Sequence, residues 1–103
     1  MAKAEVFAGI CGFKTTVIAQ MADETCMLTI ESDCAHIERL AENLKSVDPF
    51  QEISHRGDGP QSLRLAAQHC PHPACPVPAG IVKAIEVAAG LALPADATIK
   101  ITR

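Results

Sequence analysis

The chain has no tryptophan, no tyrosine and only three phenylalanines among its 103 residues. A core built around large aromatic rings is therefore excluded. The hydrophobic residues still make up 49% of the sequence, and 17 of them are alanines. We expect an interior of small side chains with closely spaced backbones, as when helices lie flat on a sheet. At this length a single domain, residues 1–103, can bury a real core without disulfides.

Long apolar runs and concentrated charge of one sign are also missing. Lys83 and Glu86 interrupt the most apolar stretch, which falls well short of the roughly 20 residues that span a bilayer. The first residues, "MAKAEVFAGICGF", do not resemble a signal peptide. The nine basic residues are scattered and the net charge is −3, so no basic stripe can neutralise a phosphate backbone. We expect a cytoplasmic protein without a nucleic-acid or membrane partner. The sequence leaves open whether it has a protein partner.

The sequence carries no familiar enzyme motif. It has no Gly-x-Ser-x-Gly elbow, no phosphate-binding loop and no paired-carboxylate signature. The "GDG" within "HRGDGP" is typical of a turn. No enzyme class follows from these observations.

Three β-rich runs open the chain. Residues 4–10 alternate Val6, Ala8 and Ile10 with other side chains, residues 14–21 follow the "CGF" turn, and residues 26–32 follow the "ADET" turn. The runs predict an antiparallel meander.

Three helices are predicted after the meander. The first follows the capping residues Ser32 and Asp33 and has a helical apolar stripe. That stripe consists of Ile37, Leu40, Ala41 and Leu44. The second spans residues 60–69, with Leu63, Ala67 and Cys70 on one side. The third spans residues 79–89, is apolar nearly all round, and stops at Gly90.

Two further strands complete the prediction. Residues 48–54, "DPFQEIS", are a candidate short strand, and "LPADATIKITR" predicts a final strand in which Ile99 and Ile101 alternate with polar residues. This order of strands and helices along the chain predicts an α+β two-layer sandwich, with a mostly antiparallel sheet of four to five strands and three helices on one face.

Five cysteines are the main chemical feature. Cytoplasmic thiols stay reduced, and the count is odd, so metal binding or thiol chemistry is favoured over disulfides. Cys11, Cys34, Cys70 and Cys75 fall at predicted element junctions, whereas Cys26 lies within a strand and is expected to be a buried hydrophobe.

Four cysteines can hold zinc or an iron–sulfur cluster. No Cys-x-x-Cys pair is present, and Cys70 and Cys75 are separated by four residues. His69 and His72 flank Cys70 and are candidate substitute ligands, while His36 and His55 are expected to be surface residues. The alternative is that two or three of these cysteines are unrelated buried thiols.

Cys75 alone supports a second hypothesis. It precedes a helix, whose positive end favours a thiolate, and Pro76 and Pro78 stiffen the backbone around it. Cys34 occupies a similar position and is a candidate second thiol.

"CPVPAGIVKA" resembles the signature of TusA-type sulfur carriers, in which Cys-Pro-x-Pro opens a helix. The resemblance implies a persulfide on Cys75, with Pro76 and Pro78 as the matching prolines, although those carriers have the motif near the N-terminus. Over its whole length the chain is similar to a small uncharacterised family of cysteine-containing proteins from anaerobic prokaryotes. The stretches that carry this similarity are "CGF", "SDC", "CPVP" and "KAIEVAAGLALP".

Three hypotheses result. The first is a zinc or iron–sulfur site made by Cys11, Cys34, Cys70 and Cys75. The second is a sulfur carrier or thiol relay that uses Cys75. The third is a non-catalytic interaction module with structural cysteines.

Overall fold

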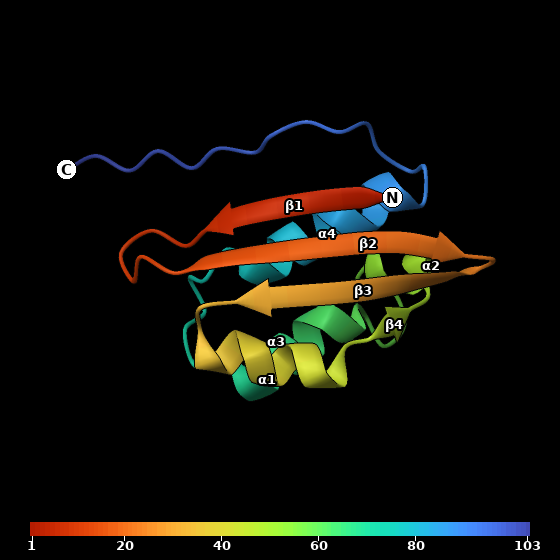
Figure 1. Ribbon diagram of the computed structural model, residues 1–103, viewed down its shortest axis with the longest axis horizontal. Coiled ribbons are helices and arrows are strands. Elements are labelled where there is room, and N and C mark those ends of the chain that lie inside the picture. Colours follow the sequence, from red (N-terminus) through yellow and green to blue (C-terminus); the bar gives the residue numbers. More distant parts are fainter.

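Four antiparallel strands form one sheet in the computed structural model, which describes residues 1–103 (Figure 1). They are β1 (Ala2–Phe7), β2 (Lys14–Ala22), β3 (Thr25–Ser32) and the two-residue β4 (Ser46–Val47). Their order in the sheet is β1-β2-β3-β4, so each strand pairs with its neighbour in sequence. The predicted meander is confirmed.

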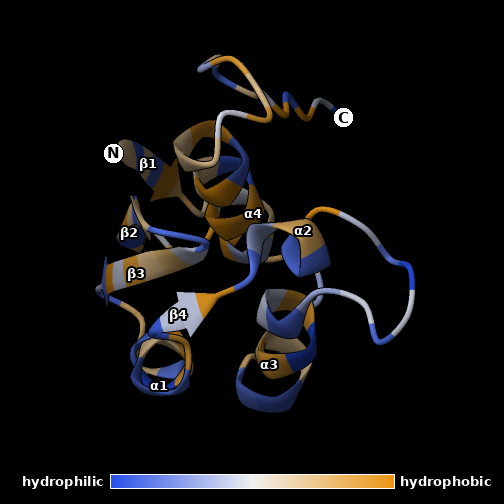
Figure 2. Cartoon of the chain, turned by 90° about the vertical axis from the view of Figure 1, so that its right-hand side faces the viewer, coloured by the Kyte–Doolittle hydropathy of each residue, from blue (hydrophilic) through white to orange (hydrophobic).

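Four helices pack against this sheet, the first along its β3 edge and the other three over one face (Figure 1 and Figure 2). They are α1 (Ala35–Asn43), α2 (Pro49–Glu52), α3 (Gln61–His69) and α4 (Val77–Ala88). The α+β two-layer class is confirmed, with one helix more than predicted. None of the helices has the length and apolar character needed to cross a membrane.

The core lies between the two layers and is built largely from aliphatic and small side chains. The sheet contributes Val17, Ala19, Cys26, Leu28 and Ile30, and the helices contribute Ile37, Leu40, Ile81, Ala84 and Ile85. No phenylalanine is buried. The low aromatic content therefore predicted the character of the interior correctly.

Helix α4 approaches the sheet most closely at Gly80. A Cβ atom built on Gly80 would lie 2.5 Å from Cγ2 of Val6 on β1. Val6 is β-branched and has little rotamer freedom, so it cannot readily move aside. The absence of a side chain at Gly80 thus sets the distance between α4 and β1.

The prediction of a strand at residues 48–54 is wrong, because this segment forms the short helix α2. The Asp48 side chain accepts a hydrogen bond from the Phe50 backbone N–H at 3.0 Å, and Pro49 occupies the first turn. An N-cap followed by proline favours a helix start over an extended strand. The short strand β4 lies just before this cap.

Helix α3 is confirmed, although its buried side differs from the prediction. Ser62 and Ala66 are buried, whereas Ala67 is exposed and Leu63 only half-buried. The carboxylate of the buried Glu52 accepts hydrogen bonds from the Gln61 and Ser62 backbone N–H groups, both at 2.8 Å. This cap from α2 fixes how the N-terminus of α3 faces the core.

The predicted C-terminal strand is wrong. Residues 91–103 are extended but belong to no strand, and Ile99 and Ile101 are 77% and 87% exposed. Gly90, at φ +74°, ends α4 with hydrogen bonds from Gly90 N–H to Val87 O and from Leu91 N–H to Glu86 O. This Schellman arrangement turns the chain away from the helix, and the alternating pattern that follows has no hydrogen-bonded neighbour in the structure.

We predict that Gly80→Ala lowers stability, although alanine normally favours a helix by about 1 kcal/mol over glycine. The added methyl group overpacks against Val6, which costs about 1–3 kcal/mol. In a Val6→Ala background the clashing Cγ2 is gone, and Gly80→Ala should become stabilising. Urea unfolding of the four proteins measures this coupling; a Gly80→Ala protein more stable than the parent would contradict the packing described.

Candidate functional site

Three of the five cysteines come together at one end of the molecule. Cys34, Cys70 and Cys75 are half-buried free thiols packed against the hydrophobic core. Burial raises the pKa of the Cys70 thiol, and the neighbouring charges of Cys75 and Cys34 raise this pKa further. Cys34 and Cys75 are therefore close enough to Cys70 to influence its ionisation.

Cys34 is the N-cap residue of α1 and directly follows the two predicted capping residues, Ser32 and Asp33. The Ser32 hydroxyl accepts a hydrogen bond from the Cys34 backbone N–H at 3.1 Å, and the Glu38 carboxylate accepts one from the Ser32 N–H at 2.7 Å. These bonds hold the turn between β3 and α1, so the position of Cys34 is fixed from both sides.

Cys70 and Cys75 bracket the connection between α3 and α4. Cys70 is the C-cap of α3, and its backbone N–H donates to Ala66 O at 2.8 Å. The Cys75 N–H donates to His72 O at 3.2 Å, which closes a turn just before the N-cap residue of α4. The chain therefore leaves one helix at Cys70 and enters the next immediately after Cys75.

The prolines affect the helix end that follows Cys75. Pro76 is the N-cap of α4 and Pro78 lies in its first turn. Proline has no N–H, so Val77 and Ala79 supply the backbone donors that remain free in this turn. The positive helix end that the sequence suggested for Cys75 is present, but it offers fewer donors than a helix start without prolines.

A cleft of about 540 Å³ opens beside two of the thiols. Cys70 and Cys75 line it together with His72 and with apolar side chains of α3 and α4. The apolar residues include Leu63, Ala66, Ala67, Pro71, Pro73, Pro78 and Ala79. A small molecule or a side chain of another protein can therefore reach these two sulfurs from solvent.

Two histidines meet at the same end of the molecule. The rings of His36 and His72 stand edge to face, with their centroids 6.2 Å apart. His72 is exposed, whereas His36, which was expected to be a surface residue, is half-buried. Both follow a cysteine by two positions, Cys34 and Cys70, but this repeated spacing does not indicate that the two rings meet.

Cys11 and Cys26 lie outside the group of three thiols. Cys26 is fully buried in β3, as predicted, and burial raises the pKa of its thiol. Cys11 is exposed in the β1–β2 connection, which lies at the same end of the molecule as the β3–α1 and α3–α4 connections (Figure 1). Lys14 and Asp33 tie that hairpin to the Cys34 turn. The Lys14 N–H donates to the Asp33 carboxylate at 3.2 Å, and the Asp33 N–H donates to Lys14 O at 3.1 Å.

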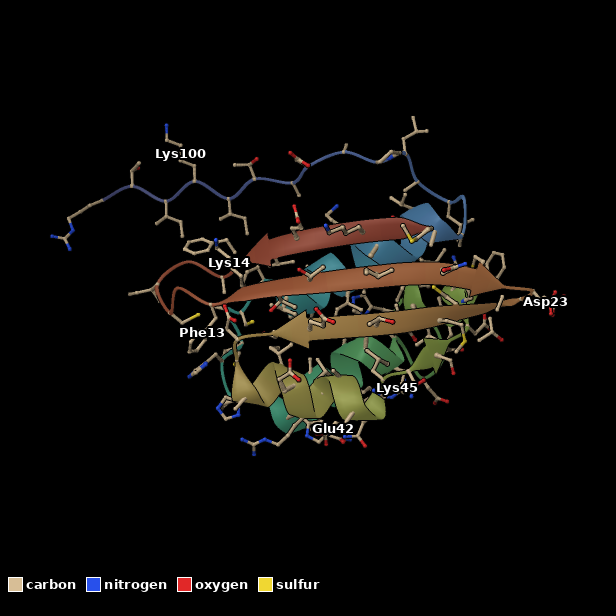
Figure 3. The ribbon with its side chains drawn as sticks, viewed as in Figure 1. Phe13, Lys14, Asp23, Glu42, Lys45 and Lys100 are labelled. Carbon is tan, nitrogen blue, oxygen red and sulfur yellow. The ribbon has the colours of Figure 1, made fainter.

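The side chains at the hairpin base are drawn in Figure 3, where Phe13 and Lys14 mark this end and Asp23 marks the opposite end of the sheet. Cys11 is therefore at the correct end of the molecule for the predicted four-cysteine site, but it is not one of the groups that shift the pKa of Cys70.

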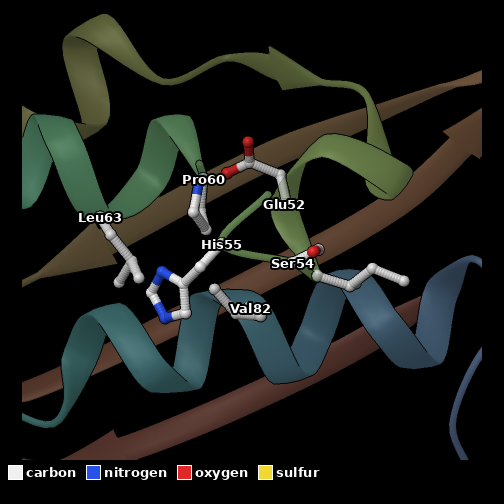
Figure 4. Close-up of a pocket in the computed structure, with 7 residues that line it drawn as sticks. Glu52, Ser54, His55, Pro60, Leu63 and Val82 are labelled. Carbon is white, nitrogen blue, oxygen red and sulfur yellow. The ribbon is translucent and has the colours of Figure 1, made fainter. Parts of the chain in front are cut away.

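A second cavity, of about 120 Å³, lies between α2, α3 and α4 (Figure 4). The His55 ring lies in it between Leu63 and Val82, so this exposed loop histidine packs its ring against the helices. The Glu52 carboxylate is already used in capping α3. His69, the other candidate ligand, is the half-buried last residue of α3.

The thiols do not form a ready-made coordination shell. As the side chains are arranged, no group of three or more His, Cys, Asp or Glu residues has the geometry to hold a metal ion. The structure therefore brings Cys34, Cys70 and Cys75 into one neighbourhood without converging their sulfurs on one point.

We predict that Cys75→Ser lowers the pKa of Cys70. The substitution removes a negative neighbour, while burial continues to hold this pKa above its ordinary value. The pH dependence of Cys70 alkylation, followed by mass spectrometry of the digested protein, measures the change. Cys11→Ser is the matched control and should leave the profile unchanged; an identical profile in the Cys75→Ser protein would contradict the proximity of the two sulfurs.

Comparison with known proteins gives one match. No curated protein and no solved structure matches the chain. A family described as a family of unknown function, DUF6951, matches residues 2–101. Since this match covers nearly the whole chain, including all five cysteines, the protein belongs to the DUF6951 family.

Proposed function

We propose that this protein binds a soft metal centre, zinc or an iron–sulfur cluster, through the thiolates of Cys34, Cys70 and Cys75. The observation that supports this most directly is that separate junctions of the fold bring Cys34 and Cys75 within electrostatic reach of Cys70. A persulfide carrier needs one thiol and a disulfide relay needs two. A metal–thiolate centre is the chemistry that uses three or more.

The electrostatics of the group favour a cation between the sulfurs. At Cys70, burial and both neighbouring thiolates all oppose ionisation. The one side-chain ion pair of the structure, Lys3 with Glu5, is on β1 and neutralises neither Cys34 nor Cys75. A divalent ion would favour ionisation of the thiols instead, because it stabilises each thiolate directly and screens the repulsion among them.

Metal binding requires the sulfurs of Cys34, Cys70 and Cys75 to move closer together than they are in the structure. Cys70 and Cys75 flank the non-helical residues 71–74, and all three thiols are half-buried rather than locked in the core. Changes of cysteine side-chain rotamer are therefore the expected response to the metal. Metal binding should also couple to proton release, because the ligands must be thiolates.

The fourth ligand has three candidate sources. Cys11 completes the four-cysteine set, and its hairpin is tied to the Cys34 turn through Lys14 and Asp33. His72 is the alternative, because it lines the cleft with Cys70 and Cys75 and contacts the ring of His36. His69, next to Cys70, is a further substitute ligand. We favour Cys11, because four thiolates suit both zinc and an iron–sulfur cluster.

The proposed setting is the reducing cytoplasm of an anaerobic prokaryote. Five free cysteines, one of them exposed, suit a compartment in which thiols stay reduced. Exposed thiolates and oxygen-sensitive clusters are both protected from oxidation under anaerobic conditions.

We predict that the anaerobically prepared full-length protein binds Co²⁺, used as a probe for zinc, with intense sulfur-to-metal charge-transfer absorption. Replacing Cys34, Cys70 or Cys75 by serine should weaken binding at least about tenfold, a loss of about 1.4 kcal/mol. Cys11→Ser and His72→Ala tested side by side identify the fourth ligand. Cys26→Ala is the matched control and should retain the spectrum. Absence of charge-transfer absorption, with the thiols titrating as free groups, would contradict the proposal and favour structural cysteines.

A second candidate function is sulfur transfer by Cys75, by resemblance to the TusA-type carriers. Its specific support is the position of Cys75 before α4, with its side chain lining the open cleft. In the transfer step the Cys75 thiolate attacks the outer sulfur of a donor persulfide, R–S–SH. The bond between the donor's two sulfurs breaks, Cys75–S–SH forms, and the donor leaves as R–S⁻.

The neighbouring thiols affect the fate of such a persulfide. Attack by a Cys70 or Cys34 thiolate on the inner sulfur would form a disulfide with Cys75 and release hydrosulfide. A lone reactive cysteine would avoid this loss, so the group of three makes the chain a sulfide-releasing relay rather than a storage carrier.

We predict for this alternative that a low-molecular-weight persulfide adds one sulfur atom to Cys75, and that the adduct persists longer in the Cys34→Ser, Cys70→Ser double variant. Intact-protein mass spectrometry under anaerobic conditions, with peptide mapping, measures both. An unmodified Cys75 in the double variant would exclude the carrier function.

A further inference from the structure

We propose that the C-terminal segment, residues 97–102, adds as a strand to the free edge of β1 in a second copy of this chain, and that two copies exchange these segments reciprocally. The proposal rests on two unpartnered features of the same structure. One is an edge strand with free backbone groups, and the other is an extended segment with a strand-like sequence that pairs with nothing.

The free edge of β1 can be specified residue by residue. The Ala8 N–H donates to Phe13 O at 3.1 Å, which continues the β1–β2 register as a hydrogen-bonded pair. Because hydrogen-bonded pairs alternate along an antiparallel ladder, the intervening residues Lys3, Glu5 and Phe7 direct their N–H and C=O groups away from β2. No strand pairs with that side.

The C-terminal segment has the composition of the missing strand. Ile99 and Ile101 alternate with Thr98, Lys100 and Thr102, and the six residues 97–102 match the six residues of β1 in length. Ile99, Ile101 and Leu93 are 77%, 87% and 88% exposed. Apolar side chains in such an alternating row are typical of a strand with one face buried.

Charge also fits this pairing. If the two isoleucines face the helical layer, Lys100 lies on the open face of the sheet, where β1 presents Glu5. Lys100 points away from the sheet in the single chain (Figure 3), so it has no acidic partner there. Strand addition would place Lys100 beside Glu5, whose exposed carboxylate pairs with Lys3 in the single chain and has room for a second cation.

The exit from α4 favours a partner copy over the chain's own edge. The Schellman turn at Gly90 sets the direction in which the chain leaves the helix, and Pro94 then restricts the backbone. Beyond Leu91 the segment makes no hydrogen bond to the rest of its own chain, and it runs outside β1 as a separate extended segment (Figure 1). A two-fold exchange would bury both segments and close both edges at once.

The experiment uses the full chain and two kinds of variant. Ile99→Asp with Ile101→Asp disables the C-terminal segment, and Ile99→Val with Ile101→Val is its matched control. Glu5→Pro disables the edge, since it removes an outward N–H without removing a bond of the β1–β2 ladder. Analytical ultracentrifugation should show a dimer for the parent and the valine control, and a monomer for the aspartate and proline variants.

Mixing the two disabled proteins tests exchange directly. The Glu5→Pro copy keeps an intact C-terminal segment and the aspartate copy keeps an intact edge, so the mixture should form a mixed dimer while each alone stays monomeric. A parent that is monomeric over the whole concentration range would overturn the proposal, as would a dimer insensitive to both substitutions. Slow amide exchange of residues 97–102 in a monomer would instead show that the segment pairs with its own chain.

Discussion

The close packing of α4 on β1 holds the helical layer at its distance from the sheet. Gly80 lets the helix approach until Val6 fills the space where a Cβ atom would stand. The helix then buries Val77, Ile81 and Ile85 against the sheet. Since Cys75 lies two residues before α4, the same packing fixes where this thiol is held.

The thiol group is a consequence of chain topology rather than of a local motif. The strand β3 ends, and α1, α3 and α4 begin or end, at one end of the sandwich, and Cys34, Cys70 and Cys75 occupy these junctions. Each thiol is partly desolvated, and at Cys70 both neighbours add to the effect of burial. Neutral thiols can tolerate this arrangement, but a full set of thiolates needs a positive charge in their midst. That requirement links the fold to the proposed metal centre.

Much of this structure follows from sequence patterns, and the exceptions have physical reasons. Alternation and turn residues predicted the meander, and apolar spacing predicted α1, α3 and α4. Asp48 and Pro49 form a capping signal that outweighs the β-like pattern after them. The pattern around Ile99 does indicate a strand, but a strand also needs a partner, and periodicity carries no information about the partner.

The candidate site was predicted in part. Junction positions predicted that Cys11, Cys34, Cys70 and Cys75 lie together, and the structure places Cys34 and Cys75 near Cys70, with Cys11 not among these neighbours. The mid-strand position of Cys26 predicted that it is buried, which the structure confirms. The sequence did not reveal that His36 and His72 face each other, because that contact joins α1 to the distant α3–α4 connection.

The most direct test of the metal centre is X-ray absorption spectroscopy at the zinc edge of the zinc-loaded, full-length protein. The account predicts a shell dominated by sulfur at about 2.3 Å, supplied by Cys34, Cys70 and Cys75 with a fourth ligand. A shell of oxygen and nitrogen at about 2.0–2.2 Å, without sulfur, would contradict it.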